Sequence, residues 1–184
     1  IVGRLAPLAT VVNVSGHHVG SDKIGHFFDM GYELYVMRKE GQSVADLVAR
    51  ARWEQQGLWG MSTTGVKSYG DISANFDGYR FWQDMLGRSE NPYFTCVNGS
   101  LKQIREVRMA DYVSAAWTEA INCSEYSNER YKVAMDKNLV ELQNRDGRRY
   151  QCPIQPAACA PLRRRYAQWL APEELSAVIS PSCN

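Results

Sequence analysis

The sequence predicts a single, mostly α-helical domain with at most a small β-hairpin. Apolar residues recur at helical spacing in several segments, residues that favour helix N-termini precede these segments, and glycines follow them. No internal repeat and no long linker divides the 184 residues. We therefore expect residues 1–184 to form one domain, with an extended segment at 1–20, the site region at 21–87 and a helical scaffold at 88–184.

The first helix is expected from residue 21 to about residue 39. Ser21 is a residue type that caps helix N-termini, and Gly41 supplies a suitable end. The apolar residues that share one side of this helix are Ile24, Phe27, Phe28, Leu34 and Tyr35.

The spacing of Ser43 and Asp46 is that of a capping box and predicts a second helix, which ends near Gly57. The segment 57–67 is punctuated by glycines, so we expect a small hairpin or an irregular loop there.

Ser68 and Asp71 repeat the capping pattern and begin a third helix, which Gly87 closes. Its apolar residues are Ile72, Phe76, Tyr79, Trp82, Met85 and Leu86. Beyond a connection at 88–107, the apolar spacing predicts helices over 109–121, 127–144, 163–170 and 173–179.

Charge and hydropathy exclude several classes of protein. The formal net charge is +1, so we expect no nucleic-acid partner. No run of about 18 apolar residues occurs, so we expect no membrane span. The chain starts at Ile1 without a charged-then-apolar leader, which favours a mature, exported form. Phosphate-binding, dinucleotide-binding and HExxH motifs are lacking, and we expect no cofactor.

The five cysteines suggest a disulfide-containing protein. The proline-flanked loop favours a Cys152–Cys159 bond, and Cys96 with Cys123 is the natural second pair, which leaves Cys183 over. Such bonds indicate a periplasmic or secreted protein. The alternative is a cytosolic protein with five buried thiols. No CxxC spacing occurs and only three His are present, so we expect no metal site.

Asp22 and His26 form the first pair of candidate functional residues. Four positions separate them, so they share one helix face. A carboxylate beside an imidazole fixes one tautomer or raises the pKa of the ring, which suits a His that transfers protons or binds a ligand. The alternative is that Asp22 caps the helix and His26 packs between its aromatic neighbours.

Asp71, Asn75 and Gly78 form a second stripe on one helix face. The helix dipole favours the ionised form of Asp71 in the first turn. Gly78 inside a helix costs about 1 kcal/mol relative to Ala, so close approach by another helix or by a ligand should compensate for it. Catalysis or binding by this stripe and simple helix packing remain open as alternatives.

Glu54 is the third candidate. It lies near the C-terminal end of its helix, where the dipole opposes a negative charge, and Trp53 and Trp59 flank it in sequence. A carboxyl group in such surroundings should have a raised pKa, as a general acid needs. The alternative is an ordinary solvated Glu.

The residues Asp22-Lys23-x-x-His26-Phe27, then Glu54, then Ser68-x-x-Asp71-x-x-x-Asn75-x-x-Gly78 form a pattern over about sixty positions. This pattern resembles the signature of VanZ-like and YfiM-like bacterial envelope proteins. The resemblance implies an envelope setting and brings no residue-by-residue mechanism. This chain departs from the membrane-embedded VanZ-like members because it has no membrane span.

A Glu at a helix end, a Gly/Ser/Thr-rich hairpin at 57–70 and a following acid are similar in arrangement to the core of lysozyme-like glycosidases. The resemblance implies a lysozyme-like helical domain with Glu54 and Asp71 as the catalytic carboxyls. Trp59, Tyr69 and Tyr79 would then stack on sugar rings. The remaining candidates for contacting the substrate are His26, Ser68 and Asn75.

We therefore expect an exported cell-wall hydrolase that cleaves glycosidic bonds of peptidoglycan or a related glycan. The alternative is a non-catalytic envelope protein of the VanZ-like or YfiM-like kind. The relative positions of Glu54 and Asp71 distinguish the two hypotheses. Glu54 and Asp71 about 5–10 Å apart across an open groove would favour hydrolysis, whereas a buried cluster of mutually bonded residues would favour the structural alternative.

Overall fold

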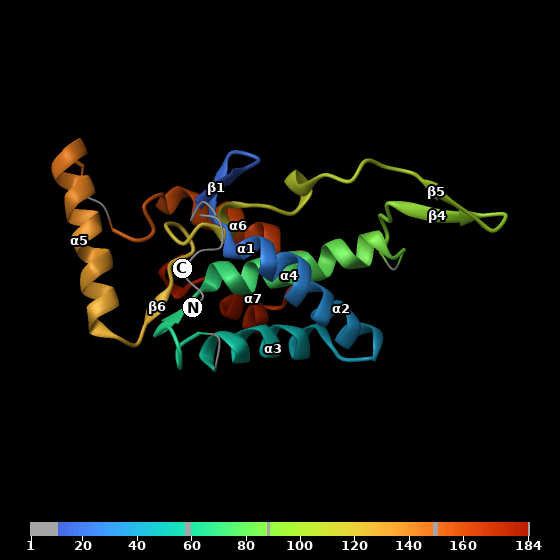
Figure 1. The fold of residues 1–184 in the computed structure, drawn as a ribbon, viewed down its shortest axis with the longest axis horizontal. Coiled ribbons are helices and arrows are strands. Elements are labelled where there is room, and N and C mark those ends of the chain that lie inside the picture. Colours follow the sequence, from blue (N-terminus) through green and yellow to red (C-terminus); the bar gives the residue numbers. More distant parts are fainter. Residues whose placement is uncertain (1–10, 58–59, 88, 149–150, 184) are drawn as a thin grey trace, which may run out of the picture.

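The computed structural model describes residues 11–57, 60–87, 89–148 and 151–183, which form a mostly α-helical fold with small two-stranded antiparallel sheets (Figure 1). The helices are α1 (Asp22–Gly25), the π-helical turn η1 (His26–Met30), α2 (Gly31–Lys39), α3 (Val44–Gln56), α4 (Tyr69–Met85), α5 (Glu129–Asp146), α6 (Cys159–Tyr166) and α7 (Pro172–Val178), with 3-10 turns η2 (Met109–Asp111), η3 (Ala115–Trp117), η4 (Pro156–Ala158) and η5 (Pro181–Cys183). The strands are β1 (Val11–Val14), β2 (His17–Gly20), β3 (Val66–Lys67), β4 (Phe94–Val97), β5 (Ser100–Gln103) and β6 (Glu125–Tyr126), paired β1 with β2, β3 with β6 and β4 with β5.

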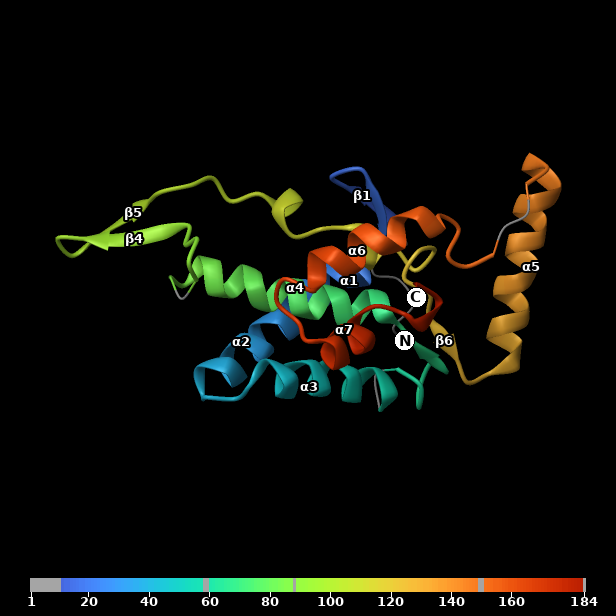
Figure 2. The ribbon, with the colours of Figure 1, turned by 180° about the vertical axis from the view of Figure 1, so that it is seen from behind.

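Helix α4 is the centre of the fold. Helices α2 and α3 lie beside it in Figure 1, and Figure 2 shows α6 along α4 and α7 between α4 and α3, both of which α7 contacts. Every residue from Tyr69 to Tyr79 is buried. The polar residues among them, Asp71, Ser73, Asn75 and Asp77, are therefore also buried and need hydrogen-bond partners within the protein.

Two segments extend away from this core at opposite ends of the molecule. The β4–β5 hairpin projects beyond the C-terminal end of α4, and α5 stands at the other end (Figures 1 and 2). Within the part of the chain that the structure describes, no helix is both long and apolar enough to cross a membrane.

The backbone of α4 crosses η1 and α2 at two glycines. A Cβ atom on Gly78 would lie 1.9 Å from the carbonyl oxygen of Phe27, and one on Gly31 would lie 2.5 Å from the Cα of Gly78. The sequence left open whether Gly78 accommodates a ligand or a helix. The structure shows that it accommodates a helix.

Several predicted helix boundaries are confirmed. Ser43 accepts a hydrogen bond from the Asp46 N–H while the Asp46 carboxylate accepts one from the Ser43 N–H, so the capping box at the start of α3 is formed. Ser68 accepts from the Asp71 N–H at the start of α4. Gly41 adopts a positive φ of 99° directly after α2. The helices expected at 127–144, 163–170 and 173–179 correspond to α5, α6 and α7, with α6 beginning four residues earlier, at Cys159.

Other expectations about local structure are wrong. Ser21 is itself in helical conformation and its side chain caps nothing. Within the segment expected to be extended, residues 1–10 lie outside the described residues, and residues 11–20 are two extended strands, β1 and β2. These strands form a hairpin, because Ser15 and Gly16 both take positive φ in the tight turn. Asn98 and Gly99 make an equivalent turn between β4 and β5.

Of the two alternatives for 57–67, the described residues show the irregular loop, and they do not form the hairpin that the lysozyme-like resemblance implies within 57–70. Turns lead there into β3, which pairs with the distant strand β6. The helix expected over 109–121 is also wrong. Ser114 accepts from the Ala116 N–H and caps only a 3-10 turn, and Trp117 is held by a hydrogen bond to Asp77 of α4. The segment therefore buries its apolar residues without forming a regular helix.

Both predicted disulfides are wrong. The bonds join Cys123 to Cys152 and Cys159 to Cys183, and Cys96 is a free, exposed thiol on the projecting hairpin. Cys159 does not close the loop with Cys152, because it begins α6 and is buried against Cys183 of η5. The presence of two disulfides is nevertheless typical of proteins from oxidising compartments.

Gly78→Ala should lower the free energy of unfolding by about 3 kcal/mol, because the added methyl group overlaps the Phe27 carbonyl. For a chain of this size the melting temperature should fall by about 6–12 °C. Gly25→Ala is the matched control, since nothing lies within 4 Å of a Cβ atom there. A Gly78→Ala melting temperature equal to that of the control would contradict the close helix crossing.

Thiol labelling of the unreduced protein should find one reactive thiol per chain, at Cys96. Non-reducing peptide mapping should recover linked peptides containing Cys123 with Cys152 and Cys159 with Cys183. These bonds close loops with sequence separations of 29 and 24, so the loss of either should cost about 3 kcal/mol of stability. Recovery of a Cys152–Cys159 peptide would refute this connectivity.

Candidate functional site

An open pocket lies between the start of the first helical segment and the end of α3. We call it the acidic pocket; its volume is about 340 Å³ and it is lined by Asp22, Gly25, His26, Asp29, Met30, Glu54 and Gln55. Three of these side chains carry a carboxyl group, and no Lys or Arg is among the described residues that line it. The pocket therefore favours ligands that donate hydrogen bonds or carry positive charge.

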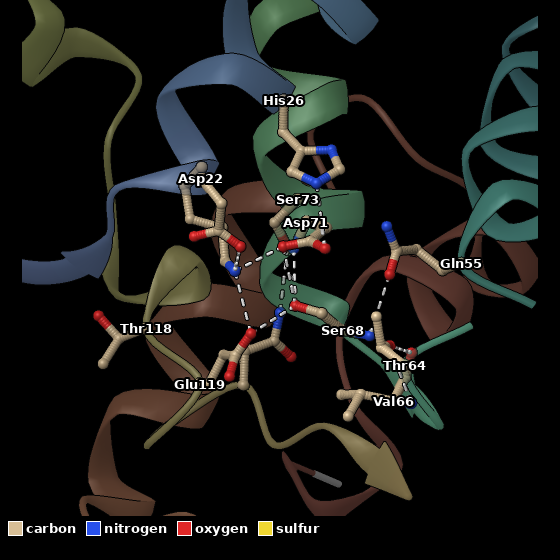
Figure 3. Close-up of polar contacts among 12 residues, drawn as sticks. Asp22, His26, Gln55, Thr64, Val66, Ser68, Asp71, Ser73, Thr118 and Glu119 are labelled. Atoms are coloured by element: carbon tan, nitrogen blue, oxygen red, sulfur yellow. Dashed lines mark hydrogen bonds and ion pairs between the residues drawn. The ribbon is translucent and has the colours of Figure 1, made fainter. Parts of the chain in front are cut away.

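Beside the acidic pocket lies a network of polar side chains, which Figure 3 shows in part. We call it the Lys23 cluster; its members are Asp22, Lys23, His26, Ser68, Asp71, Asn75 and Glu119. They come from the α1–η1 segment, from the N-terminal half of α4 and from the loop after η3. Asp22 and His26 belong to both the cluster and the pocket, so the two features are contiguous.

Lys23 is the centre of the cluster. Its side chain is 2% exposed, and its ammonium lies 2.5 Å from Asp71, 3.0 Å from Asp22 and 3.0 Å from Glu119. Burial opposes the charged form, but the three carboxylates outweigh it and raise the pKa of Lys23 well above its ordinary value. Lys23 is therefore a permanent cation. Gly70 leaves room for it, since a Cβ atom there would lie 2.9 Å from Lys23 Cε.

Asp71 is held as a carboxylate. Burial alone would favour its neutral form, but His26 and Lys23 together lower the pKa of Asp71 far below its ordinary value. Ser68 Oγ adds a hydrogen bond of 3.0 Å to the same carboxylate. At neutral pH, Asp71 can therefore orient neighbouring groups and accept hydrogen bonds, but it has no proton to give.

His26 is bound at both ring nitrogens. Nε2 lies 3.1 Å from Asp71, and Nδ1 lies 2.9 Å from the Asn75 amide. Burial opposes the imidazolium, yet the bond to Asp71 raises the pKa of His26 above its ordinary value.

The orientation of the Asn75 amide determines which His26 tautomer the cluster favours. With its nitrogen turned toward His26, Asn75 has acceptors at Nδ1 (2.9 Å) and at the main-chain carbonyls of Asp71 (3.2 Å) and His26 (3.3 Å). Nδ1 is then an acceptor and the proton of the neutral ring lies on Nε2, facing Asp71. Protonation of Nδ1 would require the amide to turn its oxygen toward the ring.

Glu54 has a different environment from Asp71. It is 4% exposed and pairs with Arg50 at 2.8 Å, but Arg50 also binds Glu33 at 2.8 Å. Two carboxylates thus share one guanidinium. Burial raises the pKa of Glu54, and Arg50 only partly opposes it. Glu54 is therefore a buried carboxyl with a raised pKa at the wall of an open pocket.

Asp22, His26 and Asp71 are also a candidate metal site. One ligand atom from each lies within 4.8 Å of the others, and a His with two carboxylates is a common donor set for divalent metals. In this structure the Lys23 ammonium bridges the two carboxylates, and Asp71 bonds to His26. A metal ion would have to displace both contacts, so this arrangement favours the Lys23-centred network.

The structure places five of the predicted site residues in two adjoining environments. His26, Ser68, Asp71 and Asn75 come together in the Lys23 cluster, and Glu54 shares the acidic pocket with His26. Asp71 is not among the residues that line the pocket.

The aromatic residues expected to stack on sugars do not line this pocket. Tyr69 and Tyr79 are buried, and the Tyr69 hydroxyl donates to Glu125 and receives a hydrogen bond from Lys67. Trp59 lies outside the described residues.

Sequence reasoning missed four residues of the site. Lys23 stood inside the motif but was not assigned a role, because a lysine is rarely buried. Glu119 comes from a loop 96 positions away from Lys23, and no local pattern indicates it. Asp29 and Gln55 follow His26 and Glu54 at short spacing, which is the only signal that the sequence offered for them.

Comparison with known protein families, with curated proteins and with solved structures finds no match for this chain.

The Asp71–His26 contact can be tested by nuclear magnetic resonance. The wild-type His26 ring should titrate above the ordinary value of about 6.5. Asp71→Asn removes the carboxylate but leaves the burial, so the His26 pKa should fall below its wild-type value. His17, whose pKa burial lowers, is the internal reference and should not change. An unchanged His26 pKa would refute the contact.

The pKa shifts of His26 and Asp71 define the pH range in which the Lys23 cluster stabilises the fold. The raised pKa of His26 contributes stability that is fully present below about pH 6.5 and is lost as the pH rises through the folded-state pKa. The lowered pKa of Asp71 contributes stability above about pH 4, and this is lost as the pH falls. Both contributions are present together between these limits.

Proposed function

We propose that this protein binds a cell-wall glycan in the acidic pocket and cleaves its glycosidic bonds, with Glu54 as the general acid. The observation that carries the proposal is the buried Glu54 carboxyl with a raised pKa at an open pocket that holds two further carboxylates. Glycoside hydrolysis needs such a combination, because one carboxyl must protonate the leaving oxygen while another activates water or stabilises the cation.

The contacts of Asp71 and Asp29 favour a residue of the acidic pocket as the second carboxylate of the reaction. Asp29 is exposed at the pocket wall, whereas Asp71 is occupied by Lys23 and His26. In this proposal Asp29 takes the role of second carboxylate by stabilising the positive charge that develops on the sugar. Asp71 is a positioning residue, which holds His26 at the edge of the pocket. The chemistry needs no cofactor.

The disulfides support the cellular setting that we propose. Two disulfides support an oxidising compartment, and we propose a periplasmic or secreted location, where peptidoglycan or a related glycan is the available polymer. The acidic pocket suits such a ligand, since sugar hydroxyls donate hydrogen bonds to carboxylates.

The second candidate is a non-catalytic envelope protein of the VanZ-like or YfiM-like kind. One observation favours it: the pattern residues Lys23, His26, Ser68, Asp71 and Asn75 bond to one another in a mostly buried cluster. In this reading the pattern fixes the packing of the first helical segment on α4, and the acidic pocket binds a ligand without chemistry.

Glu54→Gln keeps the shape of the side chain and can still accept a hydrogen bond from Arg50, but it has no acidic proton to donate. Release of muropeptides from purified peptidoglycan should therefore fall on the order of a hundredfold or more, with an almost unchanged melting temperature.

Glu33→Gln is the matched control, because it contacts the same arginine but does not line the pocket. It should keep activity and move the basic limb of the pH profile, where activity falls as Glu54 loses its proton, to lower pH, since Arg50 then pairs with Glu54 alone. Wild-type-like hydrolysis by Glu54→Gln would remove Glu54 from the mechanism. No hydrolysis by the wild-type protein on any glycan would favour the non-catalytic candidate.

A further inference from the structure

The Gln55 side chain contains a buried hydrogen-bond donor without a partner. Gln55 is 1% exposed, and its amide oxygen accepts from the Ser68 N–H at 3.3 Å. Its amide nitrogen has no hydrogen-bond partner among the described residues. Figure 3 shows that nitrogen turned away from Ser68, toward the end of the site where His26 lies. A buried donor left unpaired costs about 1–3 kcal/mol, so an acceptor from a ligand would recover this loss.

The charges of the same pocket point to a second property of the ligand. Asp22, Asp29 and Glu54 line it, and the nearby cationic groups are already committed: Lys23 bonds to three carboxylates and Arg50 to two. His26, which also lines the pocket and is cationic when protonated, pairs with Asp71. Asp29 has no such partner lining the pocket. The pocket next to Asp29 therefore has a negative electrostatic potential, which favours a cationic group on the ligand.

We propose that the acidic pocket selects a glycan with free amino groups over its N-acetylated form. The ammonium of such a sugar pairs with Asp29 and the exposed edge of Asp22, and a neighbouring sugar oxygen accepts from the Gln55 amide. This inference rests on the proposed glycan-binding function of the pocket and specifies its substrate class, de-N-acetylated amino sugars.

N-acetylation would remove the charge pairing with Asp29. The acetamide group is neutral, so the negative charge at Asp29 stays unbalanced, and the group is larger than an ammonium. A binding site that pairs with a charged group on its ligand discriminates strongly against an analogue without that group. A site that only matches the shape of the ligand discriminates less.

The test is calorimetric titration of the full chain with a glucosamine trisaccharide and with its tri-N-acetylated counterpart. The experiment is run at about pH 6, where ordinary amines are protonated. The free-amine sugar should bind at least about tenfold more tightly, which corresponds to about 1.4 kcal/mol. Asp29→Asn, an exposed change that leaves the fold intact, should bring the two affinities close together.

Gln55→Met removes the donor and should weaken the binding of the free-amine sugar, while Gln56→Met, one position along on the exposed face of α3, should not. The melting temperature of each variant separates a loss of folding from a loss of binding. Equal affinity for the two sugars, tighter binding of the acetylated one, or no binding of either would overturn the inference.

The outcomes of the two proposals are distinguishable. Cleavage of both sugars at equal rates would refute the selection of free amines and leave the hydrolase standing. Preferential binding of the free-amine sugar without any cleavage would support the inference and refute the catalytic proposal.

Discussion

The ion pair between Lys23 and Asp71 is the interaction on which the rest of the structure depends. Both side chains are almost fully buried, and α4 is buried on every face around Asp71. Two buried charges are tolerated only when each is paired and hydrogen-bonded, and removing one partner of such a pair typically costs about 3–5 kcal/mol. The positions of the first helical segment and of the Glu119 loop follow from this requirement, since both supply groups to the same ammonium.

The same requirement for partners holds along α4, where each buried polar residue bonds to at least one other element. Asp71 holds the first helical segment through Lys23 and His26, and Asn75 bonds the same His26. Two turns after Asp71, Asp77 accepts hydrogen bonds from Trp117 of η3 and Tyr166 of α6. Ser73 reaches the C-terminal end of α7 by donating to the Val178 carbonyl. The polar residues of α4 therefore hold neighbouring elements in place as well as forming part of the candidate site. The close contact between Gly31 and Gly78 lets the backbone of the first helical segment approach α4 closely enough for these hydrogen bonds to form.

The sequence predicted the helix boundaries that depend on interactions between residues close in the chain. Capping at Ser43 and Ser68 and the breaks at Gly41 and Gly87 are set by neighbours within a few positions, and the boundaries of α3 and α4 were accordingly correct. The segment at 109–121 shows where this fails. Its apolar spacing is helical, but the bond from Trp117 to Asp77 and the turn capped by Ser114 decide its backbone, and both depend on the tertiary fold.

For the disulfides and the candidate site too, the sequence predicted local features but not the contacts that depend on the tertiary fold. Cys152 and Cys159 are close in sequence, but the start of α6 directs Cys159 to Cys183. His26, Ser68, Asp71 and Asn75 could be assigned to one site because helical spacing and a shared pattern indicate them. The central Lys23 could not, since the three carboxylates that hold it come from three segments. Nor could Gln55, whose property of interest is an unpaired donor that only the packed structure reveals.

The two carboxyls that the sequence placed in one catalytic pair have opposite environments. Lys23 and His26 lie within bonding distance of Asp71 and lower its pKa, whereas Glu54 shares a single guanidinium with Glu33, so burial raises its pKa. Carboxyls whose pKa values are driven apart are suited to different roles, one as a fixed anion and one as a proton donor. Because Asp71 is absent from the lining of the acidic pocket and Glu54 is part of it, the fixed anion organises the wall of the site while the carboxyl with the raised pKa faces the pocket. The buried cluster and the open pocket are therefore compatible, since His26 and Asp22 connect a rigid interior to a surface that can bind.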